Sequence, residues 1–364
     1  MKHPISVCMI VRDEQENIEE CLRSVLPYVT EVIVVDTGSQ DLTPERASAL
    51  GAQVFHHPWS DDFSTARNAA LERATQPLIL VLDADERFAA ETEPQLARFC
   101  REQDGVAGRV LVRSFLDNVA HSNTTSEITR IFPNRPEYRY HGRIHEQLLY
   151  VGQTPVTVST GILITHTGYL SEQQEKHGKI ERNLNLLLQE HASNPDDAYT
   201  IYQLGKTCFV GQRYSEAKTW FQAAIDLVTD TGELPPWFPT LLGQYAYALL
   251  HLQDYAALFH VVESGIDLYA DFTDLYFVYG LALIDLKDPQ RLPDIRNAFE
   301  YCLHLGEPDP SRYESVHGVG SYIARYNLGV FYEVTGDAAQ AREQYRLSAD
   351  TGYEPAKKRL QLLR

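Results

Sequence analysis

Short apolar runs alternate with segments of helical periodicity along the first half of the chain. Residues 5–11 are almost all apolar, which is typical of a strand buried on both faces in a parallel sheet. Over residues 18–26 apolar side chains recur at i, i+3, i+4, i+7 and i+8, which predicts a helix with one buried face. The remaining predicted elements alternate in the same way: strands at 32–36, 53–56 and 78–82, and helices at 43–50 and 64–74. This order predicts an α/β domain with a parallel sheet of the nucleotide-binding type.

Three more strands are predicted farther along, without regular helices between them. The apolar runs that predict these strands lie at 106–115, 127–132 and 156–165. Strands without helical crossovers, added to parallel βαβ units, make a mixed sheet. We therefore expect one α/β domain with a mixed sheet over residues 1–170.

The second half of the chain is predicted to be helical, and its sequence repeats. One copy of the pattern consists of Gly205, Ala217, Phe221 and Ala224, and another of Gly329, Ala341 and Tyr345. Two weaker copies lie between them, one through Ala246, Tyr255 and Val262, and one through Gly280 and Phe299 with an insert around Pro289. The offsets are those of tetratricopeptide repeats, in which small residues let two helices approach and aromatic rings fill the adjoining space.

These patterns divide the chain into three predicted segments. The α/β domain is followed by a connecting helix over 171–194, which is highly polar at its start, and by an all-α repeat domain over 195–364. An irregular helical bundle is the alternative for the last segment. Two well-aligned copies of the repeat favour the repeat domain.

Composition and charge narrow the class of protein. With 364 residues, of which 44% are hydrophobic and 23% charged, the chain has the material for a globular core and two domains. Its formal net charge of -18 disfavours nonspecific binding to nucleic acid or anionic membranes. Five cysteines without a C-x-x-C pair favour a reducing compartment and give no zinc signature. No apolar run is long enough for a transmembrane segment or signal peptide, so we expect a cytoplasmic protein.

Acidic residues stand at the ends of two predicted strands. Asp36 ends one strand and opens the sequence Asp-Thr-Gly-Ser, while Asp83 and Asp85 follow the strand at 78–82. Ligands of open α/β sheets bind at the carboxyl ends of the strands. Two carboxylates one residue apart can hold a divalent cation, which in turn binds a diphosphate. The alternative is that Asp85 caps the next segment and that Glu86 is solvated.

Two common nucleotide-binding classes are excluded by the motifs that the sequence lacks. No G-x-G-x-x-G follows the first predicted strand, which argues against a dinucleotide-binding domain. No G-x-x-x-x-G-K-[ST] is present, which argues against a P-loop nucleotidase.

Six short motifs occur in one order over nearly half of the chain. They are Val11-Arg12-Asp13-Glu14, Asp36-Thr37-Gly38-Ser39, Phe63-Ser64-Thr65-Ala66-Arg67-Asn68, Leu82-Asp83-Ala84-Asp85-Glu86, Gly142-Arg143-Ile144-His145-Glu146 and Ile164-Thr165-His166-Thr167-Gly168-Tyr169. Together they resemble the catalytic domain of glycosyltransferase family 2, which has the GT-A fold. With the repeats added, the chain is similar to bacterial enzymes related to the S-glycosyltransferases that modify glycocin peptides of the sublancin type.

The resemblance implies roles for five residues in binding a nucleotide-sugar. Asp36 would hydrogen-bond the nucleobase, usually uracil. Main chain near Val11, with Arg12 or Glu14, would line the base pocket. Asp83 would contact the ribose or a metal-bound water.

The resemblance also implies a site for the diphosphate and a metal. Arg67 would approach the diphosphate, since a planar guanidinium suits phosphate oxygens; the alternative is a surface residue on an amphipathic helix. Asp85 would ligate Mg²⁺ or Mn²⁺. His166 matches a late histidine that often completes such a metal site, and an imidazole beside carboxylates suits Mn²⁺. A structural histidine is the equal alternative for His166.

The resemblance further implies inversion at the anomeric carbon, with one base that deprotonates the acceptor. Glu146 is our choice, because the alternation Ile144-His145-Glu146 projects its side chain from a strand end. His145 is the second choice. The alternative is that Glu146 anchors a loop or pairs with Arg143. If the acceptor is a cysteine thiol, a base matters less, because thiols ionise readily.

The leading hypothesis is a metal-dependent inverting glycosyltransferase that moves a hexose from a UDP-sugar. Its acceptor would be a peptide or protein side chain, Cys or Ser/Thr, held partly by the repeats, whose concave grooves suit extended peptides. The same repeats could instead mediate a homodimer. A glycosyltransferase for lipid-linked or cell-surface glycans is one alternative. A non-catalytic repeat scaffold is another, which intact acidic and basic motif residues oppose.

Overall fold

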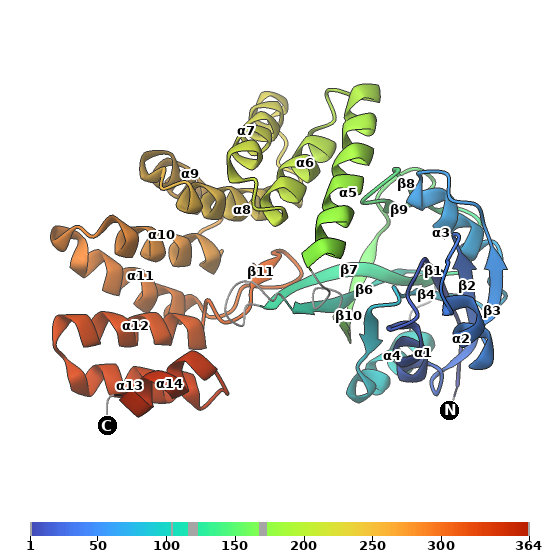
Figure 1. Ribbon diagram of the computed structural model, residues 1–364, viewed down its shortest axis with the longest axis horizontal. Coiled ribbons are helices and arrows are strands. Elements are labelled where there is room, and N and C mark those ends of the chain that lie inside the picture. The colour runs from blue at the N-terminus through green and yellow to red at the C-terminus, as the bar shows by residue number, and fades with distance from the viewer. Residues whose placement is uncertain (1, 103–104, 116–122, 167–172, 363–364) are drawn as a thin grey trace. The chain divides into compact units, whose positions relative to one another are not determined.

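The computed structural model of the chain describes residues 2–102, 105–115, 123–166 and 173–362 (Figure 1). The chain divides into two compact units, one with the N-terminal α/β part and one with the helices from residue 191 onward. Residues of the intervening helix α5 (Gln173–Ser193) belong to both units. The predicted domain boundary at 170/171 lies outside the described residues.

The first unit alternates strands and helices as the apolar pattern predicts. Its elements are β1 (His3–Val11), α1 (Ile18–Val25), β2 (Val29–Asp36), α2 (Thr43–Ala49), β3 (Gln53–His56), α3 (Phe63–Leu71), β4 (Leu78–Val81), β5 (Glu86–Phe88), η1 (Ala90–Thr92), α4 (Glu93–Glu102), β6 (Ala107–Phe115), β7 (Asn123–Pro133), β8 (Tyr138–His141), β9 (Gln147–Tyr150) and β10 (Thr157–His166). The predicted strands and helices are all present. The sequence pattern missed α4, β5, β8 and β9.

The main sheet is mixed, which confirms the predicted α/β fold class. Its strand order is β3-β2-β1-β4-β7-β6-β10-β5. Strands β3, β2, β1 and β4 run parallel, and β7 is antiparallel to β4. Strand β10 is parallel to β6 and antiparallel to β5. The parallel strands therefore end at one edge of the sheet, where the two acidic motifs follow β2 and β4.

The missed elements are short or carry few apolar positions. Strand β5 has three residues, and two of them are charged. Helix α4 buries only Leu96 and Phe99, too few for a helical stripe. Strands β8 and β9 form a separate two-stranded sheet. In β8, Tyr138 and Tyr140 are buried in the core.

The second unit is a series of paired helices. They are α6 (Ala198–Val210), α7 (Tyr214–Thr231), α8 (Phe238–His251), α9 (Tyr255–Leu268), α10 (Thr273–Leu286), η3 (Pro289–Arg291), α11 (Leu292–Leu305), α12 (Tyr322–Thr335), α13 (Ala338–Ala349) and α14 (Glu354–Leu362). The short strand β11 (Ser315–Val316) pairs with Thr124 and Thr125, which belong to the same unit. The paired helices confirm the predicted repeat domain, and the predicted insert around Pro289 forms η3.

Glycine and aromatic positions meet in the way that the repeat pattern predicts. A Cβ on Gly205 would lie 2.6 Å from the Phe221 ring, and one on Gly329 would lie 2.6 Å from the Tyr345 ring. In the stretched copy, a Cβ on Gly280 would lie 2.8 Å from Phe299. Real Cβ atoms do not approach other atoms so closely, so each helix pair depends on its glycine.

Alanine at two helical glycines should change stability in opposite directions. We expect Gly205→Ala to destabilise the fold by about 1–3 kcal/mol, because the new methyl group overlaps the buried Phe221 ring. Gly178 in α5 is exposed with open space around it, so Gly178→Ala should stabilise by up to about 1 kcal/mol through helix propensity. Urea unfolding of both variants measures the two changes. Equal effects would contradict the packing account.

One carboxyl group lies in the interior of the repeats. Asp274 in α10 is 3% exposed, and its Oδ1 accepts the backbone N–H of Val316 at 3.0 Å. Its Oδ2 has no hydrogen-bond partner among the described residues. Burial raises the pKa of Asp274 to about 8 against an ordinary value of 3.8.

This carboxyl should make the protein less stable as pH rises. The folded chain keeps the proton up to about pH 8, whereas the unfolded chain loses it near pH 3.8, so stability falls between these values. We expect Asp274→Asn, which keeps the acceptor for Val316, to raise stability by about 2–4 kcal/mol at pH 8 and little at pH 4. Thermal unfolding across this range is the measurement. The control is Asp230→Asn at an exposed position of α7, which should leave stability unchanged at both pH 4 and pH 8.

Candidate active site

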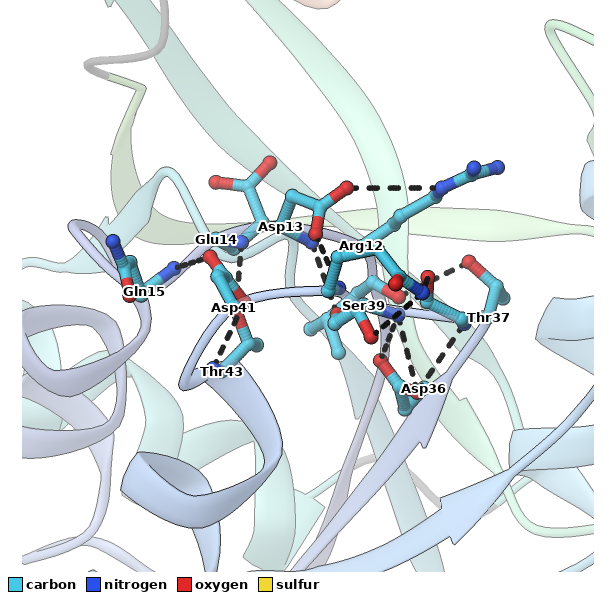
Figure 2. A network of polar contacts seen from close by, with 12 residues as sticks. Arg12, Asp13, Glu14, Gln15, Asp36, Thr37, Ser39, Asp41 and Thr43 are labelled. Atoms are coloured by element: carbon cyan, nitrogen blue, oxygen red, sulfur yellow. Dashed lines mark hydrogen bonds and ion pairs between the residues drawn. The ribbon is translucent and has the colours of Figure 1, made fainter.

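The loop after β1 and the loop after β2 are joined by hydrogen bonds (Figure 2). The backbone N–H of Asp13 donates to Ser39 Oγ at 3.0 Å, and Asp13 Oδ1 accepts from Gln40 N at 2.7 Å. The backbone N–H of Glu14 donates to Thr43 Oγ1 at 2.7 Å. Because β1 and β2 are parallel neighbours, both loops leave the same sheet edge. They form one side of the predicted nucleotide site.

Asp36 lies at the centre of this network. Its carboxylate is 6% exposed and accepts the backbone N–H groups of Gly38 at 3.2 Å and Ser39 at 3.1 Å. Gly38 has φ 109°, the left-handed region that favours glycine, which lets the chain turn back over the carboxylate. His56 Nδ1 lies 3.4 Å from Asp36 Oδ2, a neighbour that the sequence did not indicate.

The other predicted base-pocket residues lie around Asp36. Val11 is its partner across the β1–β2 ladder, and the Val11 carbonyl accepts the backbone N–H of Thr37 at 2.9 Å. Arg12 is exposed, with Nε 3.8 Å from Asp13 Oδ2. Glu14 Oε2 accepts from the Asn17 side chain at 2.9 Å. The structure therefore gathers Val11, Arg12, Glu14 and Asp36 at one end of the sheet.

A buried group of charged side chains lies at the end of β4. Arg67 Nη2 donates to Asp83 Oδ1 at 2.9 Å, and Arg67 Nε donates to Glu146 Oε1. Its remaining nitrogen, Nη1, is buried and has no hydrogen-bond partner among the described residues. Arg67 is thus not the surface residue of the alternative prediction. Its side chain is 11% exposed and joins two predicted site residues.

Arg130 on β7 is a site residue that the sequence reasoning missed. Its Nη2 donates to Asp83 Oδ2 at 3.1 Å and to Glu86 Oε1 at 3.0 Å. Glu86 is 2% exposed and its Oε2 accepts the backbone N–H of Asp83 at 2.9 Å. The alternative in which Glu86 is solvated is therefore wrong. A positive charge inside the predicted strand 127–132 was the available signal, because a charge in a strand is costly to bury without a partner.

The charges in this group shift each other's proton affinities. Burial alone would raise the pKa of Asp83, but the guanidinium groups of Arg67 and Arg130 hold it well below its usual value. For Glu86, burial raises the pKa, opposed by Arg130 and assisted by the charge of Asp83. Asp83 is thus kept as an anion between two arginines.

Asp85 and His166 meet beside this group. His166 ends β10, which pairs with β5 so that His166 faces Glu86 in the register, and its Nε2 lies 3.0 Å from Asp85 Oδ2. Its Nδ1 lies 3.3 Å from Ser114 Oγ, a contact that orients the ring. Burial lowers the pKa of His166, but the hydrogen bond and charge of Asp85 outweigh it and raise that pKa.

A carboxylate and an imidazole at this separation suit a divalent cation such as Mn²⁺. Among the described residues no three His, Cys, Asp or Glu side chains are arranged to hold a metal ion. Two protein ligands fit a site in which substrate phosphates and waters supply the others. Asp83 instead accepts hydrogen bonds from Arg67 and Arg130.

Residues 144 and 145 form a bend and not the predicted strand end. Glu146 lies directly before β9, and its Oε1 accepts from Arg67 of α3. The predicted alternative pairing of Glu146 with Arg143 is wrong, because Arg143 Nε lies 3.8 Å from Glu190 Oε2 instead. His145 has φ 51°, a left-handed backbone conformation that is uncommon for residues other than glycine, and it turns the chain just before Glu146. The structure thus brings Glu146 to Arg67, while the motif residues Thr167, Gly168 and Tyr169 lie outside the described residues.

Comparison with known families shows what the N-terminal part of the chain is similar to. The family model described as Glycosyl transferase family 2 matches residues 6–162. This stretch holds both acidic motifs, Arg67, Arg130 and Glu146, whereas His166 lies just beyond it. The N-terminal part of the chain is therefore similar to glycosyl transferase family 2 domains, as its motifs predict.

Two relatives extend the likeness into the repeats. A TPR repeat-containing protein of Synechococcus elongatus is 36% identical over 229 residues, which are 61% of this chain and 56% of that protein. The SPbeta prophage-derived glycosyltransferase SunS of Bacillus subtilis is 23% identical over 327 residues, which are 88% of this chain and 75% of SunS. The chain thus spans about half the length of the Synechococcus relative.

One solved structure that the chain matches is MamA 41-end from Desulfovibrio magneticus RS-1, which is 19% identical in sequence. The match covers 48% of this chain and 87% of the MamA chain, with a TM-score of 0.39.

Among the described helices of the chain, none is both long enough and apolar enough to cross a bilayer.

Proposed function

We propose that this protein is an inverting glycosyltransferase that moves a hexose from a UDP-sugar to a peptide or protein side chain and requires a divalent cation. The observation that carries the proposal is the buried group at the end of β4. There Arg67 and Arg130 share Asp83, and Asp85 meets His166 at 3.0 Å. These are the charges that a nucleoside diphosphate leaving group needs, at the sheet edge where ligands of α/β folds bind.

Each residue at this edge would bind a different part of the nucleotide-sugar or the metal. The network around Asp36 would hold the nucleobase, with Val11 main chain, Arg12 and Glu14 beside it. Asp83 would contact the ribose or a metal-bound water. Asp85 and His166 would hold Mn²⁺ or Mg²⁺, which would neutralise negative charge on the diphosphate.

Arg67 would lie between the sugar donor and Glu146, the proposed base. Its Nη2 donates to Asp83, which would face the donor, while Nε donates to Glu146. Glu146 would remove the proton of the acceptor as the acceptor oxygen or sulfur attacks C1 of the sugar. His145 is the second choice for this role. Arg67 would thus contribute its positive charge both near the diphosphate and beside Glu146.

The peptide acceptor has weaker support, namely the family resemblance and the grooves that such repeats form. A lipid-linked or cell-surface glycan is the alternative acceptor. The charged group at β4 speaks against a non-catalytic scaffold, because two arginines and the carboxylates of Glu86 and Glu146, with side chains at most 12% exposed, are costly to bury without a use.

Hydrolysis of sugar nucleotides separates the enzyme from the scaffold. We expect slow release of UDP from one UDP-hexose in the presence of Mn²⁺, and at least a hundred-fold slower release for Asp85→Ala. Glu91→Ala, which removes an exposed carboxylate in η1, is the control and should retain the wild-type rate. Absence of metal-dependent UDP release at high enzyme concentration, with every UDP-hexose, would refute the proposed function.

A further inference from the structure

A cavity of about 400 Å³ in the second unit is lined by residues of helices α9, α10 and α11. Figure 1 shows these three helices as neighbours in the series. This volume is within the range of pockets that hold small ligands or single side chains of a peptide. Helices α9 and α11 are the second helices of neighbouring repeats, and η3 lengthens the connection that leads to α11. The insert that stretches this repeat therefore lies next to the cavity.

Aromatic rings form much of the wall. The rings of Tyr276 and Tyr301 have centroids 4.6 Å apart at an angle of 52°, and Tyr301 is 40% exposed. Tyr279 also lines the cavity, and the buried Val262 and Ala298 contribute apolar surface. Tyrosine faces of this kind attract cations through their ring quadrupole and pack against alkyl chains.

The polar groups of the wall are acceptors for a cation. Glu263 is exposed and makes no ion pair in the described part of the chain. Asp294 Oδ2 accepts from Arg291 Nε at 2.5 Å, and Arg291 Nη2 donates to the Tyr279 hydroxyl at 2.6 Å. A guanidinium of the chain itself thus already uses an Asp and a Tyr of this wall, which leaves Glu263 for a second cation.

The helices that line the cavity carry a net negative charge, as does Glu263. Residues 255–305, which contain the three lining helices and their connections, hold 8 Asp and Glu residues, of which Asp274 keeps its proton up to about pH 8, and 3 Lys and Arg residues. Such an excess attracts basic segments from solution and repels acidic ones. A carbohydrate would be compatible with the tyrosines and Asn297 but would gain nothing from this charge.

We propose that this cavity is a docking site for a lysine or arginine side chain of a basic peptide segment. The Tyr276 and Tyr301 rings would contact its alkyl stem, and Glu263 would pair with its charge. If the proposed function holds, the segment would be part of the acceptor; docking itself does not depend on sugar transfer.

Fluorescence anisotropy with labelled peptides tests the site. The probes are two ten-residue Gly-Ser peptides, one with three Arg and one with three Glu, without donor sugar. We expect the Arg peptide to bind and the Glu peptide not to bind at the same concentration. Glu263→Gln and Tyr301→Ala should each weaken binding of the Arg peptide about five-fold, and salt should weaken it further. The matched control Glu233→Gln removes an exposed carboxylate of the same unit away from the cavity and should leave binding unchanged.

Several outcomes would overturn the proposal. Equal binding of both peptides would do so, and so would equal effects of Glu263→Gln and Glu233→Gln, which would indicate attraction by overall charge only. Binding of a free hexose that Tyr301→Ala abolishes, without binding of the Arg peptide, would assign the cavity to carbohydrate. Since no UDP-sugar is present, these results are independent of the UDP-release assay that tests the proposed function.

Discussion

Replacing Arg130 by methionine should lower kcat/KM for sugar transfer at least a hundred-fold and destabilise the fold by about 3–5 kcal/mol. The reason is that Glu86, at 2% exposed, would lose the guanidinium that balances its charge, and Asp83 would lose one of its two guanidinium partners. Asp83 would then keep one arginine and be free to turn away from the donor. Steady-state kinetics with a UDP-sugar and urea unfolding measure the two effects.

A partly buried ion pair outside the site provides the control. Arg109 Nε lies 3.0 Å from Glu127 Oε2 in the same sheet, and the Glu127 side chain is 7% exposed. Arg109→Met should also lower stability but leave kcat/KM within about three-fold. If Arg130→Met and Arg109→Met reduced activity equally, Arg130 would serve the fold and not the site.

Replacing Glu146 by glutamine should lower the rate of transfer about 10²–10⁴-fold while the affinity for UDP changes less than about three-fold. A glutamine keeps an oxygen that accepts from Arg67 Nε, but it does not take a proton from the acceptor. Single-turnover transfer and calorimetry with UDP separate the two quantities.

The neighbouring pair of Arg143 and Glu190 supplies the control. Glu190→Gln removes one carboxylate from an exposed pair at 3.8 Å and should change neither rate nor affinity. A reduction below about five-fold for Glu146→Gln would remove Glu146 from the base role for hydroxyl acceptors. Such a small effect is the result expected for a cysteine acceptor, whose thiolate forms without a base.

Much of the fold follows from features that lie close together in the sequence. The apolar run at 5–11 becomes β1, with a continuous buried stretch, because a central parallel strand is covered on both faces. Gly205 and Phe221 predict their own contact, since both belong to one helix pair. Asp83 and Asp85 are placed at the sheet edge simply because they follow the apolar strand β4.

The contacts that join distant segments were beyond sequence reasoning. Arg67 and Glu146 are 79 positions apart, and their hydrogen bond depends on how the turn before β9 reaches α3. Arg130 lies in a strand whose antiparallel register with β4 brings it to Asp83. Neither the register nor the turn has a local sequence signal, because side-chain packing across the sheet decides both.

Binding of UDP with and without Mn²⁺, measured by isothermal calorimetry, tests the central claim most directly. The claim is that Asp36, Arg67, Asp83, Asp85 and His166 form one site for a nucleoside diphosphate and a divalent cation. The account predicts that UDP binds wild-type protein at least ten-fold more tightly with Mn²⁺ and that Asp85→Ala removes this gain. UDP affinity that is independent of Mn²⁺, or no binding of UDP at all, would contradict it.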